Sequence, residues 1–149
     1  MKILIIGGGN MGKTYADSFT ANQTITKENL YILNHSQEKA DFFQKQGFQH
    51  SFIEVGDYIS EMDLIILAIK PQDAKFFYPI LLPFLKEKQL LLSIMAGVTM
   101  RGIEENLPLV RVVRAMPNLP TQIGMGITGF TAAAQVTRGV GQVCKCIKM

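Results

Sequence analysis

The sequence predicts an α/β fold with a doubly wound, mostly parallel sheet, and three observations point to it. Short apolar runs alternate along the chain with longer amphipathic segments, as strands alternate with helices in such folds. The run at 63–68 is apolar almost throughout, which is typical of a strand buried on both faces. A glycine cluster at 7–12 follows the first apolar run directly and leads into a helical segment.

The individual elements follow from these patterns in chain order. Ser36 is a suitable N-cap for the second helix and Gly47 ends it, whereas Pro79 and Pro83 mark a kink or break in the fourth. A loop is expected at 116–120, and 123–131 is expected to form a last strand or an irregular edge. The expected strands are 2–6, 30–33, 49–53, 63–68, 89–94 and 110–114, and the expected helices are 11–21, 37–46, about 56–61, 73–86 and 100–106.

Composition excludes several classes of protein. The 149 residues fit one domain, and 48% hydrophobic residues exclude general disorder. The net charge of +3 comes from scattered lysines, so no nucleic-acid partner is expected. No apolar stretch reaches the roughly 18 residues of a membrane span, and the first strand is too short for a signal peptide, so a cytoplasmic protein is expected. Cys144 and Cys146 lack further ligands nearby, so no metal site is expected.

The glycine cluster predicts a Rossmann-type dinucleotide-binding domain. Gly7, Gly9 and Gly12 fit the pattern G-x-G-x-x-G between a strand and a helix. The first glycine permits the tight turn, the second lets the backbone approach a pyrophosphate, and the third lets helix and strand pack closely. The pyrophosphate then faces free N–H groups and the positive end of a helix dipole. The competing interpretation is a glycine turn without a ligand.

The end of the second strand favours NADP(H) over NAD(H). NAD-binding proteins place an acidic residue here, whereas this chain has Asn34, His35 and Ser36. No carboxylate repels a 2′-phosphate, Asn34 and Ser36 can hydrogen-bond one, and a protonated His35 can add charge. The arginine that usually holds this phosphate is missing, and His35 fits a solvent-exposed turn equally well.

Three later loops extend this pattern into a family resemblance. The loops at 68–71, 95–99 and 116–120 each follow a strand, where ligands bind in doubly wound sheets. The strand–glycine start, the Lys-Pro loop, the Ala-Gly-Val-Thr turn and the Met-Pro-Asn-x-Pro loop occur here in order. Together they make residues 1–131 similar to the N-terminal domain of pyrroline-5-carboxylate reductases.

The resemblance implies NADPH-dependent reduction of 1-pyrroline-5-carboxylate to proline, in proline biosynthesis. The cofactor's nicotinamide supplies hydride to the imine carbon, which suits a sequence without paired carboxylates or a nucleophile–base pair. By position, the resemblance implies a pyrophosphate site at Gly7, Gly9, Asn10, Met11 and Gly12, a ribose site at Asn34, His35 and Ser36, a cofactor path along Ala68, Ile69, Lys70 and Pro71, and a nicotinamide site near Ala96, Gly97 and Asn118.

Two residues are candidates for a catalytic role. Lys70 either holds a carbonyl group or simply faces solvent. Asn118 either makes a polar contact near the substrate or forms an Asx turn between two prolines.

The sequence also departs from the family. The family continues into a C-terminal helical domain that forms the dimer and much of the imino-acid pocket, whereas 132–149 is expected to be a divergent tail with at most a short helix. We therefore expect a monomer or weak dimer that binds cofactor but lacks a complete active site. Other interpretations are a non-catalytic dinucleotide-binding regulatory module, or a related oxidoreductase, such as a β-hydroxyacid or F420-dependent NADP reductase. The 116–120 loop argues against the latter.

Overall fold

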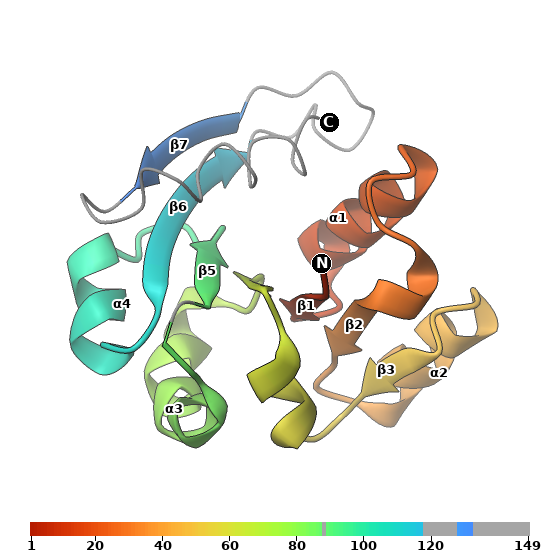
Figure 1. Cartoon of the computed structure of the whole chain (residues 1–149), viewed down its shortest axis with the longest axis horizontal. Coiled ribbons are helices and arrows are strands. Elements are labelled where there is room, and N and C mark those ends of the chain that lie inside the picture. Colours follow the sequence, from red (N-terminus) through yellow and green to blue (C-terminus); the bar gives the residue numbers. More distant parts are fainter. Residues whose placement is uncertain (88, 118–127, 133–149) are drawn as a thin grey trace.

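A seven-stranded sheet with the order β3-β2-β1-β4-β5-β6-β7 forms the centre of the computed structural model, which describes residues 1–87, 89–117 and 128–132 (Figure 1). The first six strands run parallel, and β7 pairs antiparallel with β6. The predicted doubly wound, mostly parallel sheet is therefore confirmed. The strands are β1 (Ile3–Ile6), β2 (Leu30–Leu33), β3 (His50–Phe52), β4 (Leu64–Leu67), β5 (Leu90–Ser93), β6 (Arg111–Pro117) and β7 (Thr128–Ala132).

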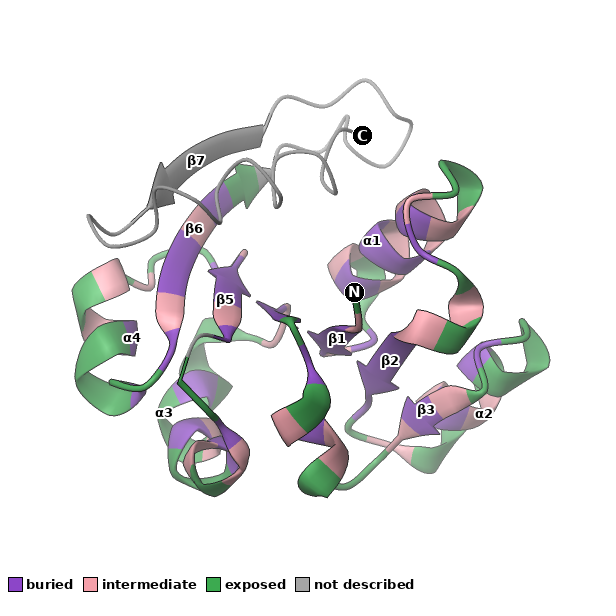
Figure 2. Cartoon of the chain, viewed as in Figure 1, coloured by how far each residue is buried: buried purple, intermediate pink, exposed green. Residues whose placement is uncertain are grey.

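Helices cover both faces of this sheet. Ile3 and Ile5 pack with residues of α1 and α2, and Leu4 and Ile6 pack with residues of α3 and α4. Strands β1, β2, β4 and β5 are consequently mostly buried, whereas the outer surfaces of the helices are exposed (Figure 2). The helices are α1 (Asn10–Ala21), α2 (Gln37–Lys45), α3 (Pro71–Leu81) and α4 (Met100–Asn106), with 3-10 turns η1 (Lys27–Asn29), η2 (Asp57–Glu61) and η3 (Leu82–Phe84).

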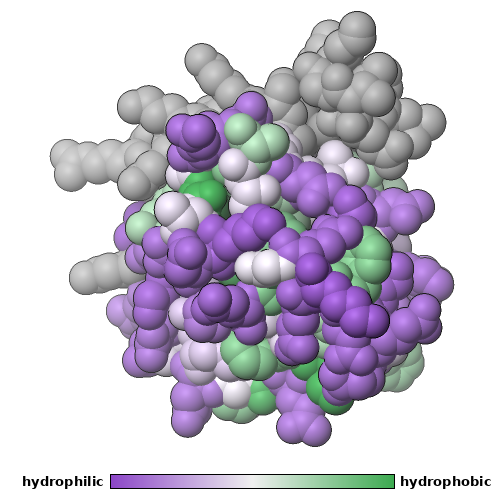
Figure 3. Space-filling model, turned by 90° about the vertical axis from the view of Figure 1, so that its right-hand side faces the viewer, coloured by the Kyte–Doolittle hydropathy of each residue, from purple (hydrophilic) through white to green (hydrophobic). Residues whose placement is uncertain are grey.

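The outer surface is mostly hydrophilic on the face shown in Figure 3, with hydrophobic residues scattered across it. Among the described residues, no helix has the length and apolar character needed to cross a bilayer.

The register of the central strands brings three loops to one level. Ile6 at the end of β1 lies opposite Leu33 of β2 and Leu67 of β4. The chain order reverses here, because β1 has β2 on one side and β4 on the other. Ligands bind outside the carboxyl ends of the strands at such a switch point.

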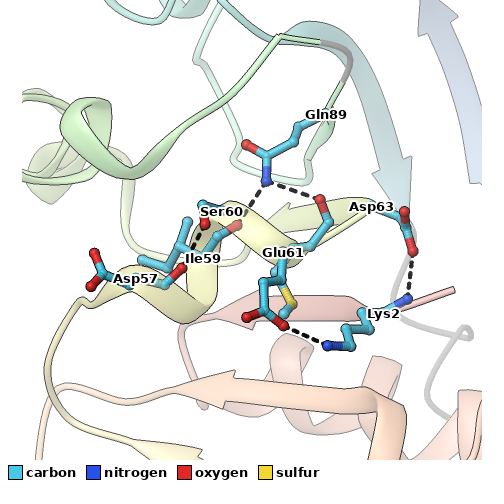
Figure 4. Close-up of polar contacts among 8 residues, drawn as sticks. Lys2, Asp57, Ile59, Ser60, Glu61, Asp63 and Gln89 are labelled. Carbon is cyan, nitrogen blue, oxygen red and sulfur yellow. Dashed lines mark hydrogen bonds and ion pairs between the residues drawn. The ribbon is translucent and has the colours of Figure 1, made fainter.

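Polar contacts at the N-terminal ends of the strands fix where β1, β4 and β5 begin (Figure 4). The backbone N–H of Lys2 donates to the carboxylate of Asp63 over 2.7 Å, and the Lys2 ammonium pairs with Glu61 at 2.6 Å. The buried amide of Gln89 donates to the carbonyl groups of Ile59 and Met62, at 2.7 and 2.9 Å. These contacts lie away from the carboxyl ends of the strands.

Three expectations near prolines differ from the structure. Helix α3 begins at Pro71 instead of 73, because proline suits the first position of a helix. Pro79 stays inside α3 and does not end it, but α3 ends at Leu81 and the 3-10 turn η3 (Leu82–Phe84), which contains Pro83, follows, so the expected break lies beside Pro83. Strand β6 continues through Met116 and Pro117, where a loop was expected, because both residues pair with β7.

Other boundaries agree with the sequence. The Ser36 hydroxyl caps α2, and Gly47, with a φ of +87°, follows the end of that helix. Strand β7 lies at the end of the segment expected to form a last strand or edge. Turn η1 had no counterpart among the expected elements. The expected short helix in 132–149, Cys144 and Cys146 fall outside the described residues, apart from Ala132 at the end of β7.

Candidate dinucleotide-binding site

A pocket of about 810 Å³ opens at the carboxyl ends of β1, β2 and β4. Pockets for small molecules and cofactors fall in the same range of size, roughly 300–1,000 Å³. One part of its lining is the glycine turn with the end of β2, and another is the loop after β4. An apolar part comes from the segment after β3 and from α3.

The glycine turn has a geometry that larger side chains would disrupt. Gly7 has a φ of +108°, and a Cβ atom on it would lie 2.6 Å from the carbonyl oxygen of Ala68. A Cβ atom on Gly12 would overlap the carbonyl oxygen of Gly7. Both glycines are therefore needed for α1 to leave β1 this tightly.

Gly9 differs from these two residues because it faces open space. Its φ of −74° is allowed for any residue, and a Cβ atom on it would meet no atom of the described residues within 4 Å. Gly9 is exposed and lines the pocket. The absence of a side chain here leaves the backbone open to close approach by a ligand.

The N-terminus of α1 adds hydrogen-bond donors to this surface. The first helical bond runs from the N–H of Lys13 to the carbonyl of Gly9, at 2.9 Å, so the N–H groups before it have no partner within the helix. No side chain caps the helix, and its first turn contains no acidic residue. This arrangement suits an anion such as a pyrophosphate. The open glycine and the uncapped helix together fit a dinucleotide cofactor.

The three residues at the end of β2 lie in different environments. Asn34 is 3% exposed, and its amide nitrogen contacts Ser51 and two backbone carbonyls. His35 is exposed and lines the pocket. The Ser36 hydroxyl accepts from the N–H of Lys39 at 3.4 Å, and Ser36 is not part of the pocket lining.

The apolar part of the pocket was not anticipated from the sequence. Ile53 and Val55 follow β3, while Phe76 and Ile80 lie one turn apart on α3. Phe76 is 79% exposed, which is unusual for a phenylalanine, and Ile80 is 51% exposed. The spacing of Phe76 and Ile80 on the helix after the Lys-Pro loop was the available signal. Glu54, Asp73, Phe77 and Gly8 were missed as well.

Charged groups of both signs surround this pocket. Lys70 is exposed at the N-cap of α3, and within the described residues its ammonium makes no hydrogen bond or ion pair. Asp73 and Glu54 lie in the same lining. The hydroxyl of Tyr58 donates to the carbonyl of Glu54 at 2.9 Å. Burial raises the pKa of Tyr58 to about 12, so the phenol remains a donor and helps to hold this segment.

The structure brings part of the expected site together. The pocket lining includes Gly7, Gly9, Asn34, His35, Ala68, Ile69 and Lys70. Outside the lining, Asn10, Met11 and Gly12 lie in the first turn of α1, Ser36 and Pro71 at the starts of α2 and α3, and Ala96 and Gly97 in the turn between β5 and α4. Asn118 falls outside the described residues. Across the described ranges, no group of His, Cys, Asp and Glu could hold a metal ion.

Comparison with known proteins supports the resemblance seen in the sequence. The pyrroline-5-carboxylate reductase of Aquifex aeolicus is 31% identical over 132 residues, which cover 88% of this chain and 48% of that protein. The structure of a pyrroline-5-carboxylate reductase from Coxiella burnetii has a TM-score of 0.88 and 31% identity, covering 99% of this chain and 55% of that chain. A Plasmodium falciparum pyrroline carboxylate reductase, solved with NADP bound, shares the fold, with a TM-score of 0.81 and 23% identity over 99% of this chain and 54% of its own.

The chain spans about half the length of the relatives it matches. In sequence and fold it resembles the N-terminal domain of pyrroline-5-carboxylate reductases, as the sequence motifs predicted. A family model described as "NADP oxidoreductase coenzyme F420-dependent" matches residues 2–97, a range that contains the glycine turn, the end of β2 and the Lys70 loop. The chain therefore belongs to this family of NADP oxidoreductases.

Proposed function

We propose that this chain is the cofactor-binding part of an NADPH-dependent reductase that converts 1-pyrroline-5-carboxylate to proline. The observation that supports cofactor binding most directly is the exposed Gly9 turn at the uncapped N-terminus of α1, beside a pocket at the switch point of the sheet. The names of the relatives and the order of the loop motifs support the imino-acid substrate.

The residues of the chain would bind and orient the cofactor. The backbone at Gly9 and the first turn of α1 would hold the pyrophosphate, and the loop of Ala68 and Lys70 would direct the nicotinamide half along the ends of the strands. The bound nicotinamide supplies the hydride for the reduction. Lys70 remains a candidate for a polar contact with the substrate, because it is one of the residues that line the pocket.

Preference for NADP(H) follows from the charges at the end of β2. The pocket lining has no carboxylate at this point, and His35 is exposed there. Ser36 begins α2, so the positive end of that helix dipole lies next to His35. The helix dipole would attract a 2′-phosphate, and a protonated His35 would add to this attraction, whereas NAD(H) would gain nothing from either feature. Glu38 in the first turn of α2 opposes this attraction in part.

The remaining parts of the site would come from sequence that this chain does not match. Since the relatives are about twice as long as the matched segment, we propose that their second half completes the imino-acid pocket and the dimer. The cytoplasmic location and the monomeric or weakly dimeric state of the chain stay predictions. Sedimentation would test the latter, and a tight dimer would contradict it.

The test is a parallel titration of the purified chain with NADPH and NADH, followed by nicotinamide fluorescence. We expect both to bind, NADPH more tightly, with little or no consumption of NADPH when 1-pyrroline-5-carboxylate is added to this chain alone. Absence of binding by either nucleotide would refute the cofactor function. NADPH binding without any turnover, even in a protein extended to the length of the relatives, would refute the reductase activity and favour a regulatory module.

A further inference from the structure

Asn34 is buried, and the orientation of its side-chain amide is fixed by its neighbours. The Nδ2 atom lies 3.0 Å from the hydroxyl of Ser51, 3.3 Å from the carbonyl of Phe52 and 3.4 Å from the carbonyl of Ile32. The Ser51 hydroxyl donates its single proton to the carbonyl of Ala40, at 3.1 Å. It must therefore accept a proton from Asn34. Three acceptors thus surround one end of the amide, and only its NH₂ group suits them.

The other end of this amide lies beneath the glycine turn. A Cβ atom on Gly8 would overlap the Oδ1 atom of Asn34 and would come within 2.7 Å of the ring of Phe43. This oxygen is buried and has no hydrogen-bond partner in the described part of the chain. A buried acceptor without a donor is unfavourable, so the contacts at the NH₂ end must impose the orientation. Asn34 fills the space that the missing side chain of Gly8 leaves.

We infer that Asn34 is a positioning residue that sets the glycine turn for dinucleotide binding, and that it does not bind the 2′-phosphate itself. This inference rests on the proposed cofactor function. Asn34 contacts Gly8 on one side, and on the other it is hydrogen-bonded to Ser51, which is bonded in turn to Ala40 of α2. The turn that would hold the pyrophosphate is thereby connected to β3 and α2.

The inference changes what an acidic residue would do at this position. An aspartate at 34 would place a carboxylate oxygen against two carbonyl oxygens, and the hydroxyl of Ser51 could donate to it only by giving up its bond to Ala40. Only the protonated acid can donate to the two carbonyls, so burial and these carbonyls would raise its pKa. Introducing the acid that NAD-binding proteins carry would therefore damage the turn without creating a ribose contact.

The experiment measures dissociation constants for NADPH and NADH in Asn34→Ala and Ser51→Ala, at a temperature where circular dichroism shows each variant folded. We expect both dissociation constants to rise by about fivefold in each variant, because that is the effect of losing one hydrogen bond of ordinary net strength. The ratio of the NADPH constant to the NADH constant should stay unchanged. The Ser51 variant is the more discriminating, because Ser51 is buried and is not part of the pocket lining.

Gln89→Ala is the matched control. Gln89 is a buried amide with three side-chain hydrogen bonds, like Asn34, but it lies just before β5, at the N-terminal ends of the strands and away from the pocket (Figure 4). This variant should unfold at a lower temperature and still bind both nucleotides with unchanged affinity. Weakened binding in all three variants would mean that general destabilisation explains the effect, and the inference would fail.

Two further outcomes would overturn the inference. If Asn34 held the 2′-phosphate directly, Asn34→Ala would weaken the binding of NADPH but not of NADH, and Ser51→Ala would leave both affinities unchanged. Asn34→Asp would strengthen NADH binding at about pH 7 if a carboxylate here reached the ribose. We expect this variant instead to bind both nucleotides more weakly, and its affinity to recover towards about pH 5, as the acid is protonated. If Asn34→Ala does not fold, the Ser51 and Asp variants decide. Failure of the unmodified chain to bind either nucleotide would refute the cofactor function instead.

Discussion

Replacing Gly9 or Gly12 by alanine should separate cofactor binding from stability within one turn. At Gly12 the new methyl group would overlap the carbonyl of Gly7 and lie 3.2 Å from a methyl group of Ile5. Helix α1 would have to move away from β1, and such overpacking costs about 1–3 kcal/mol. We expect Gly12→Ala to lose both stability and affinity for NADPH.

Gly9→Ala should lose affinity alone. The methyl group would meet no atom within 4 Å in the part of the chain that the structure describes, and the backbone at Gly9 is in the extended region. Alanine is a poorer N-cap than glycine, but it reduces the entropy of the unfolded chain, and these opposing effects are each about 1 kcal/mol or less. The free energy of unfolding should therefore change by less than about 1 kcal/mol. A pyrophosphate in van der Waals contact with Gly9 would clash with the methyl group, which should raise the dissociation constant roughly tenfold or more.

The assay combines thermal unfolding, followed by circular dichroism, with NADPH titration of the same samples. Unchanged NADPH affinity in Gly9→Ala would refute the proposed position of the pyrophosphate. Unchanged stability in Gly12→Ala would refute the packing argument, because it would show that α1 can accommodate the methyl group at no cost.

Three other predictions concern the rest of the molecule. Phe76→Ala should leave thermal stability almost unchanged, because the ring is 79% exposed, but should weaken NADPH binding about fivefold through loss of apolar contact; equal binding would exclude the ring from the site. Tyr58→Phe should lower the free energy of unfolding by about 1 kcal/mol through the lost bond to Glu54, equally at neutral pH and at about pH 9, because the tyrosine pKa is near 12. The hydrogen bond from Lys2 lowers the pKa of Glu61 in the folded protein, so this ion pair stabilises the fold above the pKa that Glu61 has in the unfolded chain, and the stabilisation is lost as the pH falls through its folded pKa. Lys2→Met should therefore remove this pH dependence from thermal melting curves. A difference in melting temperature between acid and neutral pH that is the same in Lys2→Met as in the unmodified chain would contradict the prediction.

The sequence was sufficient to predict the elements that depend on local chemistry. Strand–helix alternation, the spacing of the glycines and the Ser36 cap are all properties of short segments, and the structure has each of them. The sheet and the position of the glycine turn could therefore be predicted before the structure was known.

What the sequence could not predict depends on contacts between distant segments. The inward orientation of Asn34 is set by Ser51, 17 residues later, so the residue type alone suggested an outward role. Phe76 and Ile53 reach the same pocket only because the start of α3 and the end of β3 both lie at the carboxyl ends of the parallel strands. Strand β6 extends to Pro117 because β7 pairs with it, a tertiary effect that overrides the turn preference of proline.

The complete burial of β1 and β4 has a consequence for how their alignment is encoded. All four residues of each strand are buried, so a slip by one position would still place apolar side chains on both faces. Alternation of polar and apolar residues therefore does not specify the pairing of these strands. The residues that specify it lie at the two ends: before the strands the carboxylate of Asp63 accepts from the N–H of Lys2, and at the other end Gly7, with a φ of +108°, fixes where β1 stops. Damage to these flanking residues should thus produce misaligned but compact molecules, with the cofactor loops at different heights, more readily than unfolded chains.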